Sequence, residues 1–174
     1  MQTRICRLVD RRDICIQTID LNSPGDGEVV IQMGAGGICG SDLHYYNDGG
    51  FGPIKVKEPI ILGHEVSGTV LALGSQVENL TLGDKVALNP SHPCGDCAYC
   101  QKNIFQHCLN MRFFGSALRF PHEQGAFRET MVVKSGQCFP VRAATPLAHA
   151  ACAEPLAVCL HARSRAPKLK GKRI

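Results

Sequence analysis

The chain of 174 residues contains no tryptophan, and only 6% of its residues are aromatic. It also lacks an uninterrupted apolar run of the length, about 20 residues, that a membrane-spanning helix requires. Residues 1–20 alternate apolar and polar side chains and carry charges, which excludes a secretory signal peptide there. With 44% hydrophobic and 20% charged residues, the composition is that of a soluble globular protein, and we expect a cytoplasmic location.

The charge balance excludes a second class of function. The formal net charge is +4, which is too small to indicate a nucleic-acid-binding surface. A basic stretch at residues 168–173 is typical of a solvated face. The length allows one domain, or one domain and the start of another, and no internal repeat is present.

Ten cysteines are the most unusual feature that the chain does contain. Two residues separate Cys94 from Cys97 and Cys97 from Cys100, and seven separate Cys100 from Cys108. Without a signal peptide, such tight spacing favours metal binding over disulfides. Four thiolates around one tetrahedral Zn²⁺ leave no open position, so we predict a structural zinc site that carries out no chemistry.

The rest of the chain is typical of a mainly β protein. Runs rich in valine, isoleucine and leucine, bounded by turn residues, predict strands within residues 28–40, 67–74, 84–90 and 125–141. Many glycines and prolines spread between them fit the turns of a β-barrel or sandwich. The first clear helical pattern comes late, after Pro155 at a helix start.

A second set of residues is suited to a metal that performs chemistry. A catalytic zinc takes three protein ligands and leaves one position for water or substrate. Cys39 and His64 are suitable ligands, and Glu65 and Glu154 are alternatives for the third. Taken singly, Cys39 is more commonly a small buried hydrophobic residue, and His64 beside Glu65 a hydrogen-bonded pair.

Longer motifs point to a known family. The segment GHEVSGTVLALGSQV, residues 63–77, resembles the signature of the zinc-containing medium-chain alcohol dehydrogenases. GGICGSDLHYY at residues 36–46 is similar to the family segment that carries the first catalytic ligand, and the four-cysteine segment follows at the family spacing. NMRFFGSA (110–117) and AEPLAVCLHA (153–162) resemble the polyol and sugar-acid members.

The resemblance implies a fold and a ligand set. It implies a GroES-like fold, a distorted and mainly β barrel with short helices from which the four-cysteine segment projects. It implies two Zn²⁺ per chain, with Cys39 and His64 as ligands of the catalytic ion. Glu154 matches the position where polyol enzymes place a glutamate, and Glu65 reaches the metal in some members. The choice between these two carboxylates stays open.

The resemblance also implies roles for side chains around the catalytic zinc. Ser41 and His44, two and five residues after Cys39, match the proton-relay positions of the family. Tyr45 matches a substrate-pocket position of sorbitol dehydrogenase-like enzymes, and we expect Phe114 to line the same pocket.

One part of the family pattern is missing from the chain. The glycine-rich G-x-G-x-x-G turn of a nucleotide-binding domain is absent, and the glycines at residues 34–40 lack that spacing. We expect residues 1–150 to form the catalytic domain, with the zinc lobe at about 90–115. Residues 151–174 are then a linker helix that leads to a nucleotide-binding (Rossmann) domain outside this chain. The chain alone is expected to be inactive.

The implied function is therefore that of a zinc-dependent NAD(P) dehydrogenase acting on a small polyol or sugar acid. Oxidation of L-idonate to 5-ketogluconate is the leading reaction, and threonine and sorbitol or xylitol dehydrogenases are alternatives. We expect a homo-oligomer at full length and no nucleic-acid or membrane partner. A different class, the non-catalytic zinc-binding module, explains the four cysteines but predicts one zinc per chain where the dehydrogenase predicts two.

Overall fold

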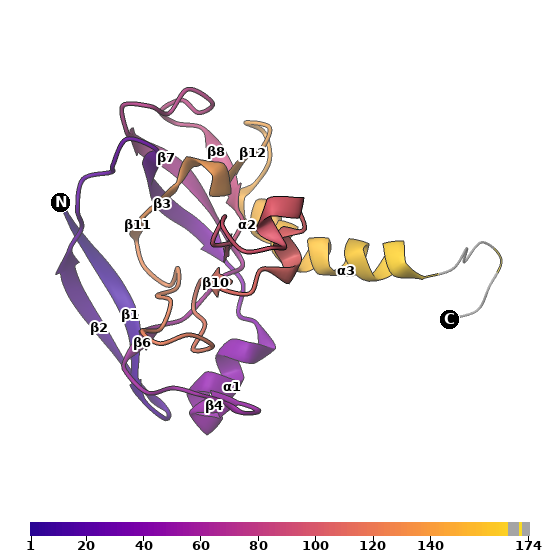
Figure 1. The fold of residues 1–174 in the computed structure, drawn as a ribbon. Coiled ribbons are helices and arrows are strands. Elements are labelled where there is room, and N and C mark those ends of the chain that lie inside the picture. The colour runs from indigo at the N-terminus through magenta and orange to yellow at the C-terminus, as the bar shows by residue number, and fades with distance from the viewer. Residues whose placement is uncertain (167–170, 172–174) are drawn as a thin grey trace.

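Two antiparallel sheets organise the chain in the computed structural model, which describes residues 1–166 and 171 (Figure 1). The larger has the strand order β11-β3-β7-β8-β12, and the smaller has the order β2-β1-β6. Strands β4 and β5 form one short hairpin, and β9 pairs with β10. The bounds are β1 Gln2–Asp10, β2 Asp13–Asp20, β3 Glu28–Gly36, β4 Gly50–Phe51, β5 Ile54–Lys55, β6 Ile60–Ile61, β7 Val66–Leu73, β8 Lys85–Leu88, β9 Ser91–His92, β10 Arg112–Phe113, β11 Thr130–Lys134 and β12 Cys138–Pro140.

The core follows from the apolar runs in the sequence. The centre of the larger sheet is buried because β3, β7 and β8 carry β-branched side chains that pack well on a pleated surface. A second buried cluster lies under the smaller sheet and consists of Leu8, Tyr45, Ile60, Leu62 and Ala117.

The two sheets are joined along β1 and the segment before β11. Ile5 forms an isolated bridge with Arg128, and the Cys6 amide donates to the Phe127 carbonyl at 2.8 Å. The buried Thr3 hydroxyl accepts from the Thr130 amide at 3.0 Å. These contacts curl the sheets around a common interior, and the mainly β, GroES-like architecture expected from the sequence is confirmed.

Three α-helices lie within the described residues: α1 Gly40–Asp48, α2 Leu147–Ala151 and α3 Ala153–Arg165. Helix α3 begins two residues before Pro155, close to the predicted start, and projects away from the sheets (Figure 1). Three short 3₁₀ turns are η1 Cys100–Lys102, η2 Phe105–His107 and η3 Ser135–Gln137.

Helix α1 corrects the expectation that the first helix comes late. It has little amphipathic pattern and is fixed by its ends. Cys39 is the N-cap, and its amide donates to the Asp42 carboxylate at 2.9 Å, while Gly49 ends the helix with a φ of 64°. The predicted strand over residues 28–40 therefore ends at Gly36.

Two further expectations concern membrane-spanning helices and the C-terminal residues. No helix in the described part of the chain is long and apolar enough to cross a bilayer. The basic stretch at residues 168–173, and the end of the linker expected over residues 151–174, fall almost entirely outside the described residues.

Candidate metal centres and the adjoining pocket

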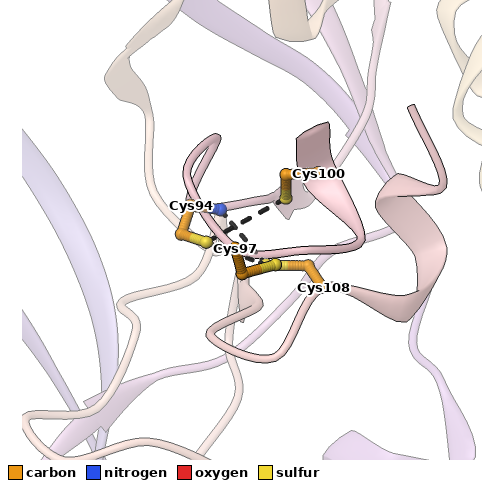
Figure 2. Close-up of side chains that lie close together, drawn as sticks. All are labelled: Cys94, Cys97, Cys100 and Cys108. Atoms are coloured by element: carbon orange, nitrogen blue, oxygen red, sulfur yellow. Dashed lines mark hydrogen bonds between the residues drawn. The ribbon is translucent and has the colours of Figure 1, made fainter. Parts of the chain in front are cut away.

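The four predicted cysteine ligands converge in a lobe, residues 94–108, between β9 and β10 (Figure 2). Their sulfur atoms all lie within 4.8 Å of one another. Sγ of Cys94 is 3.4 Å from Sγ of Cys108 and 4.0 Å from Sγ of Cys100. Zinc–sulfur bonds of about 2.3 Å in a regular tetrahedron give sulfur–sulfur separations of about 3.8 Å, so the lobe fits a four-thiolate zinc site.

The backbone of the lobe favours thiolates at some of these positions. Amide donors of Cys100 and Leu109 lower the pKa of Cys97 to about 6, and the Cys94 amide lowers the pKa of Cys108. Burial instead raises the pKa of Cys100 to about 12. Because a metal-bound thiol is deprotonated, the ion itself would be needed to hold all four cysteines as thiolates.

A second group brings together Cys39, His64 and Glu65. One ligand atom from each lies within 4.8 Å of the others. Cys39 stands at the start of α1, and His64 and Glu65 lie between β6 and β7. Gly63, whose φ of 92° suits glycine, forms the turn that precedes His64. A thiolate, an imidazole and a carboxylate form a donor set suited to a catalytic zinc, with a position left open.

Asp42 joins the two segments of this group, a role that the sequence did not reveal. Its buried carboxylate accepts from the Cys39 amide at 2.9 Å and from the Gly63 amide at 3.1 Å. The same carboxylate lies 3.9 Å from Nδ1 of His64. This Nδ1 is buried and has no hydrogen-bond partner among the described residues. Metal-binding histidines commonly donate their second ring N–H to a carboxylate, and Asp42 is the carboxylate nearest to this nitrogen in position for that role.

Glu154 lies near this group but outside its 4.8 Å limit. It is half-buried in the first turn of α3. Burial raises the pKa of Glu154, nearby His64 lowers this pKa, and Glu65 raises it again. The two carboxylates therefore lie close enough to interact, and Glu65 is the one within ligand distance in this structure.

Helix α1 presents the two expected relay residues. Ser41 and His44 are three residues apart, so they lie on one side of the helix. Ser41 is half-buried and His44 is exposed, with Nδ1 of His44 3.1 Å from the Asp48 carboxylate. Their role in proton transfer stays a prediction.

The structure places the two expected pocket residues in the core. Phe114 is 4% exposed in the cluster under the larger sheet. Tyr45 is also 4% exposed, and its hydroxyl accepts from the Ala117 amide at 3.2 Å. The neighbouring Phe113 instead lies against His64, with 5.2 Å between ring centroids. Contact of Tyr45 and Phe114 with a substrate stays a prediction, and Phe113 is a residue that the sequence interpretation missed.

A pocket of about 550 Å³ adjoins Glu154. One wall is α3 with Val158 and His161, and another is the lobe with Gln106. Ser91 of β9 also lines the pocket. Small-molecule sites are commonly mostly apolar pockets with a few polar groups, and this pocket is of that kind.

Comparison with known proteins identifies the fold family. The family model for the alcohol dehydrogenase GroES-like domain matches residues 25–143. This chain belongs to that family. The presence of both metal-ligand groups agrees with the zinc-containing members, and the expected family is confirmed.

The relatives include dehydrogenases of a sugar acid and of a polyol. The chain is 44% identical over 176 residues to L-idonate 5-dehydrogenase (NAD(P)(+)) of Escherichia coli K12, covering 100% of the chain and 50% of the relative. It is 36% identical to sorbitol dehydrogenase of Bacillus subtilis, covering 94% of the chain and 45% of the relative. It spans about half the length of the curated relatives it matches.

Solved structures agree with these relatives. The crystal structure of L-idonate 5-dehydrogenase from Escherichia coli superposes with a TM-score of 0.90 at 43% identity, covering 99% of this chain and 49% of that one. A zinc-binding dehydrogenase from Sinorhizobium meliloti, solved with NADP bound, gives a TM-score of 0.81 at 30% identity, covering 94% and 45%. The chain is thus homologous to part of medium-chain dehydrogenases that act on alcohol groups.

Proposed function

We propose that this chain supplies the zinc-binding, alcohol-activating part of an NAD(P)-dependent dehydrogenase. The observation that carries the proposal is the grouping of Cys39, His64 and Glu65 within 4.8 Å, apart from the four-cysteine lobe. A structural module needs only the lobe. The second group, with its open position, is what an enzyme that binds a substrate oxygen requires.

The proposed roles follow from the positions of the side chains. Cys39, His64 and Glu65 would hold the catalytic zinc, with Glu154 as the neighbouring carboxylate that exchanges with Glu65 or with water. Zinc, when bound, lowers the pKa of a coordinated hydroxyl and polarises a carbonyl. Cys94, Cys97, Cys100 and Cys108 would hold the structural ion.

Proton removal would use α1. Oxidation of an alcohol releases a proton that must leave the site, and a hydroxyl followed by an imidazole can pass it to solvent. Ser41 is half-buried and His44 exposed, so the pair leads from the interior outward. The Asp48 carboxylate lies 3.1 Å from Nδ1 of His44 and would hold the imidazole in its outward position.

The exposed apolar side chains of α3 support the proposal that this part of the enzyme works with a further domain. In our proposal residues 1–150 are the catalytic domain, with the lobe at about 90–115, and residues 151–174 are a linker to a nucleotide-binding domain. Helix α3 has no buried residue, and Leu156, Val158 and Leu160 are each more than half exposed. Such an apolar surface is suited to packing against another domain or subunit. The chain alone is therefore expected not to oxidise an alcohol with NAD(P).

The proposed substrate is a polyol or sugar acid, with L-idonate, oxidised to 5-ketogluconate, as the first choice. The similarity to L-idonate 5-dehydrogenase over 100% of the chain favours it. Sorbitol, xylitol and threonine are the alternative substrates, and a substrate panel on the protein with its nucleotide-binding domain separates them. Activity of the isolated chain with L-idonate and NAD(P) would contradict the proposed domain division.

Zinc content tests the second metal site directly. We expect two zinc ions per chain in the unmodified protein and one in a Cys39→Ala variant, because the variant loses one ligand of the catalytic site only. Cys159→Ala, which changes an exposed cysteine of α3, is the matched control and should keep both ions. A single ion in the unmodified chain would favour the non-catalytic zinc module.

A further inference from the structure

A second cavity lies across the β9–β10 ribbon from the catalytic group. Arg112 pairs with His92 and Phe113 pairs with Ser91, and neighbouring residues of a strand point to opposite faces. Phe113 contacts His64, and Ser91 lines the pocket beside Glu154, so that face belongs to the candidate catalytic site. The opposite face opens on a cavity of about 370 Å³ lined by His92, Cys94, Asn110, Arg112, Arg119 and Phe120.

The two arginines of this cavity have too few acidic partners. The Arg112 guanidinium donates to the Glu123 carboxylate and, at 2.7 Å, to the Pro121 carbonyl. Among the described residues, the Leu109 carbonyl is the one acceptor to which Arg119 donates. Its Nε is buried without a hydrogen-bond partner, and no carboxylate lies within ion-pair distance of it among the residues that the structure describes.

Glu123, the carboxylate that pairs with Arg112, also interacts electrostatically with a third guanidinium, that of Arg128. Burial and the nearby Arg7 lower the pKa of Arg128 to about 10, and Glu123 is the acidic group that opposes them. Partly buried cations are stable when an anion pairs with them. At the cavity itself, Arg112 has the Glu123 carboxylate as its acidic partner, whereas Arg119 has no carboxylate partner in the described part of the chain.

We propose that this cavity binds a small oxyanion, a carboxylate or a phosphate, with Arg119 as the principal donor and Arg112 at its side. The planar guanidinium presents paired N–H groups that match such anions. A volume of about 370 Å³ lies within the roughly 300–1,000 Å³ of small-molecule sites. The site is separated from the candidate catalytic group by the β9–β10 ribbon and does not depend on the proposed function.

The metal lobe offers the main alternative partner for these arginines. Four thiolates on one divalent ion carry a net negative charge, and Cys94 lines the cavity. The Asn110 amide nitrogen is the cavity's side-chain donor toward Cys94, at 4.0 Å. Neither arginine donates to a cysteine sulfur in the described part of the chain, which favours an external anion.

Anion titration of the zinc-loaded chain tests the proposal. Inorganic phosphate, gluconate and the neutral sorbitol are added at constant ionic strength, and binding is followed by amide NMR shifts and calorimetry. We expect saturable binding of phosphate or gluconate, with shifts at Asn110 and Arg119, and none with sorbitol. The anion that binds more tightly identifies the source as phosphate or as a sugar-acid carboxylate.

Variants locate the site. Arg119→Gln should weaken anion binding at least tenfold, and Arg119→Lys, which keeps the charge but not the planar fork, should weaken it less. Arg163→Gln, on the exposed α3, is the matched control and should bind as the unmodified chain does. Circular dichroism and zinc content establish that each variant is folded, and the NMR shifts of the unmodified chain locate the site independently.

Three results would overturn the proposal. The first is the absence of saturable binding by either anion. The second is unchanged binding by Arg119→Gln. The third is faster zinc release to a chelator by Arg119→Gln without any anion binding by the unmodified chain, which would mean that the arginine serves the thiolates.

Discussion

Replacing Asp42 by alanine should destabilise the fold and the second metal site together. The change leaves the amides of Cys39 and Gly63 without their acceptor in a buried region. Each unsatisfied buried group costs roughly 1–3 kcal/mol, so we expect a loss of about 2–6 kcal/mol in the free energy of unfolding. Asp42→Asn keeps one acceptor oxygen and should lose about half as much.

The metal site should respond as well, because Asp42 holds the Cys39 and His64 segments in register. Loss of a residue that supports metal ligands typically lowers metal affinity by about 10–100-fold. Urea unfolding and chelator competition on the zinc-loaded chain measure the two effects, and the zinc of the cysteine lobe should be retained.

Asp48→Asn is the matched control, since it alters an exposed carboxylate on the same helix. It should change stability by less than about 1 kcal/mol. If the free energy of unfolding of Asp42→Ala lies within about 0.5 kcal/mol of that of the control, which is the ordinary scatter of surface substitutions, and the variant binds two zinc ions as tightly, the linking role is refuted.

Three further predictions concern the lobe, the larger sheet and the surface. Cys97→Ser should lose the lobe's zinc and increase amide exchange in the lobe while leaving the sheets protected, and a lower melting point of the whole chain would show that the lobe is not separable. Gly68→Ala should lower the free energy of unfolding by roughly 1–3 kcal/mol, because a Cβ there meets the Gln32 carbonyl oxygen. The loss would be measured as a lower urea midpoint, and an unchanged midpoint would exclude this close approach. A hydrogen bond from Lys134 lowers the pKa of Glu28 from its ordinary 4.5, so the pair stabilises the fold above that pH and less as the pH falls through the lowered pKa. Lys134→Met should therefore cost less than about 1 kcal/mol at pH 7 and nothing once Glu28 is protonated, whereas a loss that is independent of pH would point to another cause.

The accuracy of each sequence-based prediction depended on how local its pattern was. The four cysteines lie within one short loop, so their spacing alone predicted their convergence, and Figure 2 shows the sulfur atoms facing one another. The strands β3, β7 and β8 follow from runs of apolar β-branched residues. Helix α1 was missed because it is fixed by the Cys39–Asp42 cap and not by apolar periodicity.

Predicting the ligands of the candidate catalytic zinc required more than a local sequence pattern. Cys39 and His64 are distant in sequence, and their residue types alone left the third ligand open. The family resemblance supplied the candidates, and the structure brought Glu65, ahead of Glu154, within 4.8 Å of the other two. The distance between Cys39 and the His64–Glu65 segment depends on how α1 packs against the turn at Gly63, and the spacing of residues in the sequence does not predict that packing.

The sequence by itself determined the mainly β character, the four-cysteine lobe and the set of residues from which a second metal site is built. Only the tertiary structure decided that Asp42 ties two segments together, that Phe113 rather than Phe114 lies against His64, and that Arg119 has a buried nitrogen without a partner. The physical reason is that periodicity and spacing fix which side chains lie near one another along the chain. Contacts between segments depend on how strands and turns pack, and a shift of one residue along a strand turns a side chain from one face to the other.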